Sequence, residues 1–328
     1  MTYEYCKRNT LRSGHNHTVS VDADDDAQRH IFDSVLMKRL VISFSGGRTS
    51  GYMTKRILDE WSEIYDDIVV LFANTGCEHE KTLDFVKACD DNFGFNTVWL
   101  EAVVNPEQGK GIRHKVVTFE TASRNGEPYF ALTAKEGIPN VSRPNCSSRL
   151  KNYPIRSYVR DFLGHKKHDY DQCYGIRVDE IDRMSEAALA IGVKYPLVGW
   201  GIRKEHVLHW WDKQNFDLDL PEHMGNCVTC FKKSDRKLLT IAKHHPEYFE
   251  PFQRIEQENG MAGTLAAKEG KQVFFRKHRS VSDIIASSKQ PFREWFPGIE
   301  EMRQQGLFTD EELDVSNGCV ESCEVDFI

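Results

Sequence analysis

The chain has 328 residues and a formal net charge of −7, with 40% hydrophobic and 28% charged residues. This length allows one large core, or a core domain with a smaller one, and the composition is that of a soluble globular protein. No apolar run is long enough to cross a bilayer and no apolar secretory segment is visible, so we expect a cytoplasmic protein with no membrane partner. The acidic balance argues against wholesale coating of nucleic acid, although local basic patches remain compatible with it.

The N-terminal residues 1–37 are polar and include an acidic run at residues 22–26. They carry no periodic apolar pattern of the kind that builds a core. We therefore expect a polar extension that precedes the folded part of the chain.

The first strong signal is an apolar, β-branched run at residues 40–44, which leads into a Ser-Gly-Gly turn. A helix-compatible segment follows to about Trp61, so the pattern predicts a strand, a tight loop and a helix N-terminus. Backbone N–H groups at such a helix start, approached closely through glycines, form a phosphate site. The loop lacks the Walker A pattern. The residues expected to contact a nucleotide here are Ser43, Ser45, Gly46, Gly47, Arg48, Thr49 and Ser50.

Strand, helix and strand then alternate, with apolar strands predicted at residues 68–73 and 97–102 and a helix between them at 80–92. This spacing is typical of right-handed βαβ units with a parallel sheet. Ligands of parallel sheets bind beyond the carboxyl ends of the strands. We therefore expect the turn formed by Asn74, Thr75 and Gly76 to lie near the base or ribose of the nucleotide.

Residues 105–145 are rich in Gly, Pro, Asn and Ser and predict long loops with short elements. A further strand is predicted at 170–176, a last short strand at 195–200 and a helix at about 205–214. The residues that follow the strand at 170–176 suit a phosphate or sulfate oxyanion, because guanidinium groups bind such oxygens in a bidentate way. The alternative is a surface Arg–Glu pair of little energetic value. The residues concerned are Gly175, Arg177, Glu180 and Arg183.

Four motifs occur in one order along the chain: S-G-G-x-x-S at 45–50, N-T-G at 74–76, a basic segment with Cys146, Lys151 and Pro154, and G-x-R-x-x-E-x-x-R at 175–183. Together they resemble the phosphoadenylyl-sulfate (PAPS) reductase-like family of the PP-loop ATP-pyrophosphatase superfamily, over about residues 38–255. Asn74 stands where that family usually has Asp.

The resemblance implies an α/β fold with a parallel twisted sheet and flanking helices, of the adenine nucleotide alpha hydrolase-like (HUP) type, plus a C-terminal helical subdomain. We expect three parts: the extension 1–37, a nucleotide-binding domain at 38–215 and a helical, cysteine-containing region at 216–328. It also implies an enzyme that binds Mg²⁺–ATP on the loop at 45–50 and transfers AMP to a substrate with release of pyrophosphate.

The chain contains nine cysteines, which without a signal peptide favour reduced thiols, metal ligation or catalysis over a disulfide scaffold. In iron–sulfur sulfonucleotide reductases, a cysteine pair joins a downstream C-x-x-C to hold a [4Fe–4S] cluster. Here Cys146, Cys227 and Cys230 match, but Ser147 replaces the second cysteine of the pair. Three ligands would leave one iron open. Alternatively the fourth ligand is Cys173, Cys319 or Cys323, and zinc is the competing metal.

Three functions follow as hypotheses. The first is an adenylating enzyme that transfers sulfur to a nucleic-acid base or a small molecule with the help of the cluster. The second is a sulfonucleotide reductase in which Cys323 or Cys319 attacks sulfur while Lys151 and Arg177 hold the oxyanion, although the tail lacks the expected E-C-G-x-H pattern. The third is a non-catalytic nucleotide-binding protein with structural zinc. A nucleotide, a nucleic-acid acceptor and a second copy of the chain are the candidate partners.

Overall fold

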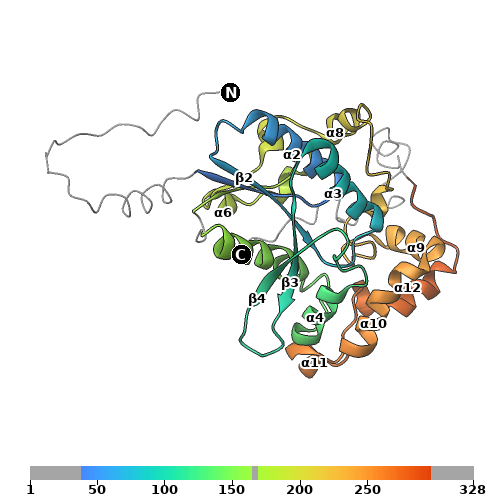
Figure 1. Ribbon diagram of the computed structural model, residues 1–328. Coiled ribbons are helices and arrows are strands. Elements are labelled where there is room, and N and C mark those ends of the chain that lie inside the picture. Colours follow the sequence, from blue (N-terminus) through green and yellow to red (C-terminus); the bar gives the residue numbers. More distant parts are fainter. Residues whose placement is uncertain (1–37, 165–168, 297–328) are drawn as a thin grey trace, which may run out of the picture. The chain divides into compact units, whose positions relative to one another are not determined.

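A single six-stranded sheet organises the described part of the chain, residues 38–164 and 169–296 of the computed structural model (Figure 1). Its strand order is β4-β3-β2-β1-β5-β6, and all neighbours are parallel except β3 and β4. The strands are β1 (Arg39–Ser43), β2 (Asp67–Asn74), β3 (Val98–Val104), β4 (Ile112–Val117), β5 (Asp171–Cys173) and β6 (Val193–Lys194). The predicted α/β class with a mostly parallel sheet and flanking helices is confirmed, in a Rossmann-like arrangement.

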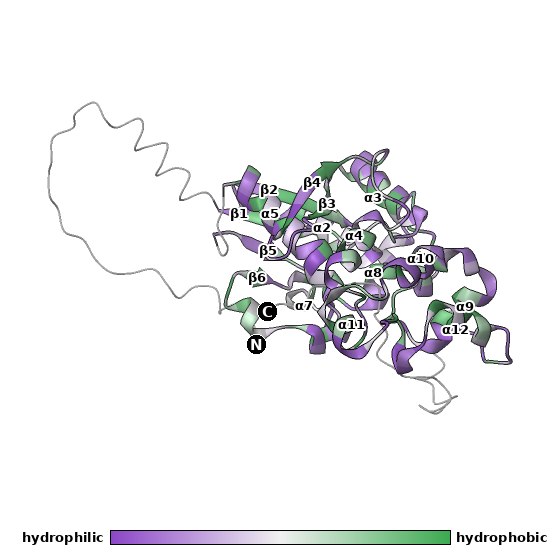
Figure 2. Ribbon diagram, turned by 90° about the horizontal axis from the view of Figure 1, so that it is seen from below, coloured by the Kyte–Doolittle hydropathy of each residue, from purple (hydrophilic) through white to green (hydrophobic). Residues whose placement is uncertain are grey.

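Helices cover both faces of this sheet because its central strands are apolar on both sides. In β1, Leu40 and Ile42 belong to a core shared with the helices α2 (Arg48–Glu60), α3 (Glu80–Phe93) and α8 (Lys204–Trp211). Val41, between them in sequence, belongs to a separate core with α5 (Tyr153–Phe162). Successive side chains of a strand alternate between faces, so a strand covered on both sides needs an uninterrupted apolar run. Figure 2 shows the central strands as mostly hydrophobic.

The strand order changes direction at β1. From β1 the chain adds β2 and then β3 on one side, and it later returns to place β5 on the other side of β1. Open parallel sheets bind ligands at such a switch point, in the crevice outside the carboxyl ends of the strands. The loops after β1 and β5 are therefore the first place to look for a site.

The helices after residue 216 pack on the middle of the chain. Phe231, Leu238 and Phe252 share a core with Leu132 of α4 and with Leu150. The expected C-terminal helices thus share a core with residues that precede the expected boundary at 215. The remaining helices of seven residues or more are α4 (Glu127–Glu136), α9 (Asp235–His244), α10 (Glu250–Asn259), α11 (Gly263–Glu269) and α12 (Val281–Ser288).

Two expectations about local structure were wrong. Residues 195–200 are not a strand: Pro196 begins the short helix α7 (Pro196–Gly199), because its fixed φ suits a first helical position and it cannot donate to a sheet ladder. Residues 105–145 hold more structure than the predicted loops, since they contain the edge strand β4 and the ten-residue helix α4. The turn-forming residues of this stretch are confined to the connections between the two.

Shorter helical turns complete the described chain. They are Ser148–Asn152, which runs into α5, Val178–Arg183, α6 (Glu186–Leu189), Glu222–Met224, Pro246–Phe249 and Arg276–His278. None of the helices in the described residues is both long and apolar enough to span a membrane. The predicted extension 1–37 and the tail with Cys319 and Cys323 lie outside the described residues.

Candidate functional site

The loop after β1 presents the N-terminus of α2. Gly47 is the N-cap and, within the described chain, no side chain caps this end of the helix. Gly46 has a φ of +78°, and a Cβ atom there would lie 2.7 Å from Cγ2 of Thr82. Glycine is therefore required at this position both for the backbone conformation and for the close packing against α3. The result is a set of first-turn N–H groups without a capping side chain, which is what a phosphate needs.

The hydroxyl groups of the loop are held in place by one another. The Oγ atoms of Ser45 and Ser50 lie 2.8 Å apart, and the Ser45 backbone N–H donates to Ser50 Oγ at 3.2 Å. Ser43, at the end of β1, is half-buried. Arg48, also expected at the nucleotide, instead makes a bidentate ion pair with Asp217, with both N···O distances 2.7 Å. The arginine thus anchors the segment that passes over the loop.

Arg177 connects the loop after β5 to the loop after β1. Its Nη1 donates to Oγ1 of Thr49 at 2.8 Å, and only 1% of the Arg177 side chain is exposed. Its Nε and Nη2 donate to the Asp179 carboxylate at 3.2 and 2.9 Å. Burial alone would raise the pKa of Asp179, but the hydrogen bond and the charge of Arg177 outweigh it and hold that pKa below its usual value. The alternative of a surface Arg–Glu pair was therefore wrong for Arg177.

The other residues of this motif support Arg177. Glu180 is buried, and its Oε1 accepts a hydrogen bond of 2.5 Å from Nη1 of Arg183. Its Oε2 lies 3.5 Å from Nη1 of Arg177 and accepts the Arg177 backbone N–H at 3.4 Å. Gly175 is buried at the end of β5. We read Glu180 as the residue that sets the orientation of both arginines.

A small cavity lies between residues 45–47 of the loop and the segment 218–226. Glu222 lines it, with ion pairs to Lys204 at 2.6 Å and Lys237 at 3.0 Å. Burial would raise the pKa of Glu222, but these two lysines outweigh it and lower that pKa to about 2. Its neighbour His223 has a pKa lowered to about 4, by burial and by the charges of Lys233 and Lys237. Cationic side chains thus gather beside the phosphate loop.

The turn after β2 is rigid and buried. Both amide hydrogens of Asn74 are used, since Nδ2 donates to Glu101 Oε1 at 2.7 Å and to the Ser123 carbonyl at 2.8 Å. Asn74 therefore ties β2 to β3 and has no amide hydrogen left for a nucleotide. Gly76 has a φ of +78°, and a Cβ atom there would lie 3.0 Å from the backbone nitrogen of Gly126.

Glu78 is the centre of this turn. Its carboxylate accepts hydrogen bonds from Oγ1 of Thr75 at 2.8 and 2.9 Å, from the Thr75 backbone N–H at 2.9 Å and from the Cys77 N–H at 3.2 Å. Nζ of Lys151 lies 3.6 Å from it, with only 10% of the lysine and 1% of the glutamate side chain exposed. Lys151, predicted from the sequence as an oxyanion ligand, is thus half of a buried ion pair that fixes the turn.

The structure brings together the three cysteines that the sequence selected. Cys146, Cys227 and Cys230 line one pocket, together with Lys151 and Lys232. Cys227 and Cys230 are buried, and Cys77 packs against them. We call Cys77, Cys146, Cys227 and Cys230 the thiol group. Cys77 was missed by sequence reasoning; the available signal was its place directly after a strand and an N-T-G turn, where parallel sheets present ligands.

Other candidates for the fourth metal ligand are placed differently. Cys173 is fully buried in the core that β5 shares with α2 and α3, so it is not part of the thiol group. Cys323, predicted as a ligand, and Cys319 lie outside the described residues. Among the residues that the structure describes, no three His, Cys, Asp or Glu side chains are placed to hold a single metal ion.

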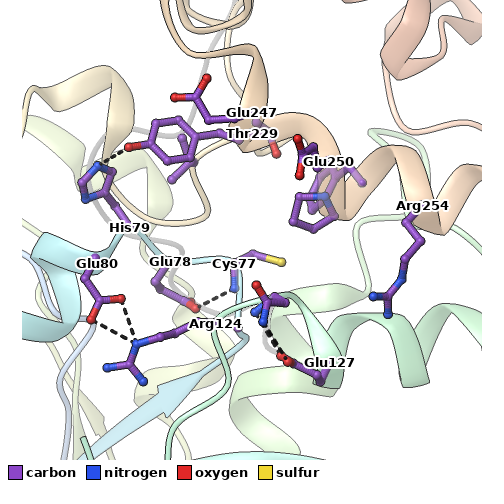
Figure 3. Close-up of a pocket in the computed structure, with 16 residues that line it drawn as sticks. Cys77, Glu78, His79, Glu80, Arg124, Glu127, Thr229, Glu247, Glu250 and Arg254 are labelled. Atoms are coloured by element: carbon purple, nitrogen blue, oxygen red, sulfur yellow. Dashed lines mark hydrogen bonds and ion pairs between the residues drawn. The ribbon is translucent and has the colours of Figure 1, made fainter. Parts of the chain in front are cut away.

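A larger cavity of about 530 Å³ opens on the other side of Cys77 (Figure 3). His79 lines this cavity. Its Nδ1 accepts a hydrogen bond from the Lys81 backbone N–H at 3.0 Å, and its Nε2 lies 2.9 Å from the hydroxyl of Tyr248. Burial and the charge of Lys81 lower the pKa of His79, so its imidazole is neutral at pH 7 with the proton on Nε2. Charged side chains line the rest of the cavity: Glu78, Glu80, Glu127, Glu247, Glu250, Arg124 and Arg254.

Comparison with known proteins gives two relatives. The chain is 30% identical over 295 residues to the uncharacterized nin region protein ORF290 of Escherichia phage lambda, a match that spans 87% of this chain and 94% of the phage protein. It is also 28% identical over 120 residues to the uncharacterized protein MJ0973 of Methanocaldococcus jannaschii, which spans 37% of this chain and 22% of that protein. No family model matches the chain.

Proposed function

The chain belongs to the family of the nin region protein ORF290 of phage lambda, and for this member we propose the function of an ATP-binding PP-loop enzyme of the PAPS reductase-like type. It adenylates a substrate with release of pyrophosphate, and it transfers sulfur with the help of a group held by cysteines. The observation that carries this proposal is the hydrogen bond between Arg177 and Thr49, because it joins the two loops at the switch point of the sheet.

The geometry of the loop supports nucleotide binding. The N-terminus of α2 offers backbone N–H groups, and Gly46 lets the loop that presents them pack closely against α3. Arg177, paired with Asp179, fixes Thr49 in the first turn of this helix. In the adenylation step an acceptor oxygen attacks the α-phosphorus, the bond to the bridging oxygen breaks, and pyrophosphate leaves with the electron pair. Donors that are fixed before the reaction stabilise this departing charge. Mg²⁺ would arrive with the phosphates, as is usual for this ion.

The position of the thiol group supports sulfur chemistry at the same sheet edge. Cys77 follows β2 directly, and Thr75 Oγ1 lies 3.4 Å from Sγ of Cys227. The turn at 74–78 thus contacts the C-x-x-C segment and lies on the strand next to the phosphate loop. The donor set, four thiols, suits an iron–sulfur cluster. When bound, such a cluster supplies electrons or sulfur, while the residues of the chain bind and orient the nucleotide and the acceptor.

The cavity beside Cys77 is the proposed acceptor site. Its volume of about 530 Å³ is within the range of small-molecule sites. Five glutamates and two arginines line it, so its field disfavours a polyanionic group in the cavity and favours a neutral or cationic one. A nucleic-acid base extruded from its strand, with its carbonyl oxygen as the acceptor, meets this requirement, and so does a small amide.

We also infer that the sheet is of the adenine nucleotide alpha hydrolase-like type. The strand order around β1 and the position of the loop at 45–50 support this assignment. A nucleotide-binding domain of this type uses the loops after β1, β2 and β5, and these loops carry the matched motifs.

The test is calorimetric titration with Mg²⁺–ATP, followed by analysis of the products. We expect saturable ATP binding that is lost in Ser50→Ala, and release of pyrophosphate when an acceptor is supplied. Binding without pyrophosphate release, across nucleic-acid and small-amide acceptors, would instead favour a non-catalytic nucleotide-binding protein. Release of sulfite from adenylyl sulfate without ATP would favour a reductase.

A further inference from the structure

The buried hydroxyl of Tyr129 indicates that a hydrogen-bond partner is missing from the structure. The residue is 1% exposed, and among the described residues its hydroxyl oxygen has no hydrogen-bond partner. The ring packs between Phe252 and Phe274, with centroid distances of 5.2 and 6.0 Å, so the hydroxyl cannot turn to solvent. Burying a hydroxyl without a hydrogen-bond partner destabilises the folded protein. Native proteins rarely leave such a group unsatisfied, and each instance asks for an explanation.

Tyr129 lies beside the thiol group. It lines the same pocket as Cys146, Cys227 and Cys230, and Cys77 packs against the last two of these cysteines. A phenol hydroxyl is a hydrogen-bond donor. The natural acceptor in this place is a group bound by the thiols.

Cys77 is fixed to the C-x-x-C segment through the backbone. The Val228 N–H donates to the Cys77 carbonyl at 3.1 Å, and Glu78 forms a β-bridge with Cys227. These contacts hold the turn after β2 against the loop that carries Cys227 and Cys230. The four thiols therefore come from three separate segments that the fold holds together. A set of metal ligands that is formed before the metal binds requires such fixed segments.

A cluster and a single ion require different spacings of the four thiols. Four thiolates around one Zn²⁺, with Zn–S bonds of about 2.3 Å, would lie about 3.8 Å from one another. A four-iron cluster places its own iron and sulfide between the cysteines, so its ligands are farther apart. The two lysines that line the pocket, Lys151 and Lys232, offset the negative charge of such a cluster.

We propose that Cys77 supplies the fourth thiolate of a [4Fe–4S] cluster held with Cys146, Cys227 and Cys230, and that the Tyr129 hydroxyl donates a hydrogen bond to this cluster. The inference rests on the function proposed above, since it specifies the group that the cysteines hold. Each iron then has one protein ligand and none is open. Cys77 lines the acceptor cavity as well, which places the cluster directly beneath that cavity.

The experiment compares the full-length wild type with five variants, each purified anaerobically: Cys77→Ala, Cys146→Ala, Cys173→Ala, Cys323→Ala and Tyr129→Phe. Iron and sulfide content, visible absorption and the EPR spectrum are measured, with circular dichroism to verify folding. We expect four irons per chain in the wild type and in Cys173→Ala. Cys77→Ala and Cys146→Ala are expected to lose iron or to retain a three-iron form that is visible by EPR.

Tyr129→Phe tests the hydroxyl through the reduction potential of the cluster, which would not change if the residue only packed against its neighbours. We expect it to keep four irons but to shift the reduction potential of the cluster to more negative values, because hydrogen bonds to cluster sulfurs stabilise the reduced form. An unchanged potential in Tyr129→Phe would overturn the role of the hydroxyl. A folded Cys77→Ala that keeps four irons and the wild-type spectrum would overturn the role of Cys77.

The outcomes separate this inference from the function on which it rests. If the wild type holds four irons and Cys323→Ala loses them while Cys77→Ala does not, the inference fails and the cluster remains. If the anaerobic wild type contains one zinc or no metal, both the cluster and this inference fail. Pyrophosphate release is measured in the same preparations and tests adenylation independently of iron.

Discussion

Arg177 donates a hydrogen bond of 2.8 Å from Nη1 to Oγ1 of Thr49 and so joins the loop after β5 to the first turn of α2. The two loops follow neighbouring strands, between which the strand order changes direction. Because the guanidinium is buried and is held by Asp179 on its other edge, its charge is fixed beside the phosphate loop before any ligand arrives.

Replacing Arg177 by Lys should weaken ATP binding about tenfold or more. A charged hydrogen bond is worth about 1.5–3 kcal/mol, and lysine cannot reproduce the planar fork that contacts Thr49 and Asp179 together. Calorimetric titration with Mg²⁺–ATP measures the change. Arg56→Lys is the matched control, because Arg56 lies in α2 away from the phosphate loop, where it bonds Glu60 and Tyr52 and lies over the ring of Trp200. An equal loss of affinity in the control would contradict the role given to Arg177.

Glu222→Gln should remove part of the dependence of stability on acid pH. The pKa of Glu222 in the folded protein is about 2, below its ordinary value of 4.5. Its stabilising effect is therefore complete above about pH 4.5 and is lost as the pH falls toward 2. We expect the variant to be less stable than the wild type at pH 7, by on the order of 3 kcal/mol, with the difference vanishing near pH 2.

Urea unfolding at a series of pH values provides this measurement. The exposed Glu269 serves as the control, since Glu269→Gln should leave the pH profile unchanged. His223 contributes a separate loss of stability between about pH 6.5 and 4 in all of these proteins, because its pKa in the folded state is lowered to about 4. A constant difference between wild type and Glu222→Gln from pH 7 to pH 2 would show that Glu222 does not act through its charge.

The sequence allowed the sheet and the phosphate loop to be predicted because both depend on local patterns. A short, β-branched apolar run such as residues 40–44 favours a strand buried on both faces, and a glycine turn before a helix can be recognised within a few residues. The prediction of a strand at 195–200 was wrong because Pro196 favours the first position of a helix over a place in a sheet, whatever the apolar pattern. The helix α4 was missed because its first turn follows Gly126 in a stretch dominated by turn residues.

The site was only partly predictable because its contacts are distant in sequence. Cys77 and Cys227 are 150 residues apart, and no local sequence pattern at either residue predicts that β2 ends beside the C-x-x-C loop. The roles of Asn74 and Lys151 likewise depend on partners elsewhere in the chain, Glu101 and Glu78. Spacing rules find ligands within one segment, whereas these side chains are brought together by the strand order.

Gly46→Ala should destabilise the fold by roughly 2–4 kcal/mol, from the left-handed backbone and from overpacking against α3. The added Cβ atom would lie 2.7 Å from Cγ2 of Thr82 and 3.1 Å from Cγ2 of Val86. Gly94→Ala is the matched control, because Gly94 also has a positive φ, of +66°, but nothing lies within 4 Å of its Cβ position. Denaturant unfolding should show only about 1–2 kcal/mol for the control. Equal losses of unfolding free energy in the two variants would show that the contact with Thr82 does not contribute to the destabilisation by Gly46→Ala.

Lys151→Met should destabilise the protein by about 3–5 kcal/mol, because it leaves the carboxylate of Glu78 buried without its cation. The double variant Lys151→Met/Glu78→Gln should recover part of this loss, since neither buried charge then remains. A double-mutant cycle of unfolding free energies measures the coupling. Strictly additive losses would mean that the two side chains do not interact, and that another contact fixes the turn at 74–78.

The most direct test of the proposed function is the fate of ATP labelled in its γ-phosphate. The anaerobically purified wild type is incubated with Mg²⁺ and an acceptor mixture of transfer RNA and small amides, with a folded Ser50→Ala variant as the control. We predict that the label appears in pyrophosphate, at a rate that the variant reduces at least tenfold. Label in orthophosphate, or no product from a protein that binds ATP, would contradict the assignment of this chain as an adenylating enzyme.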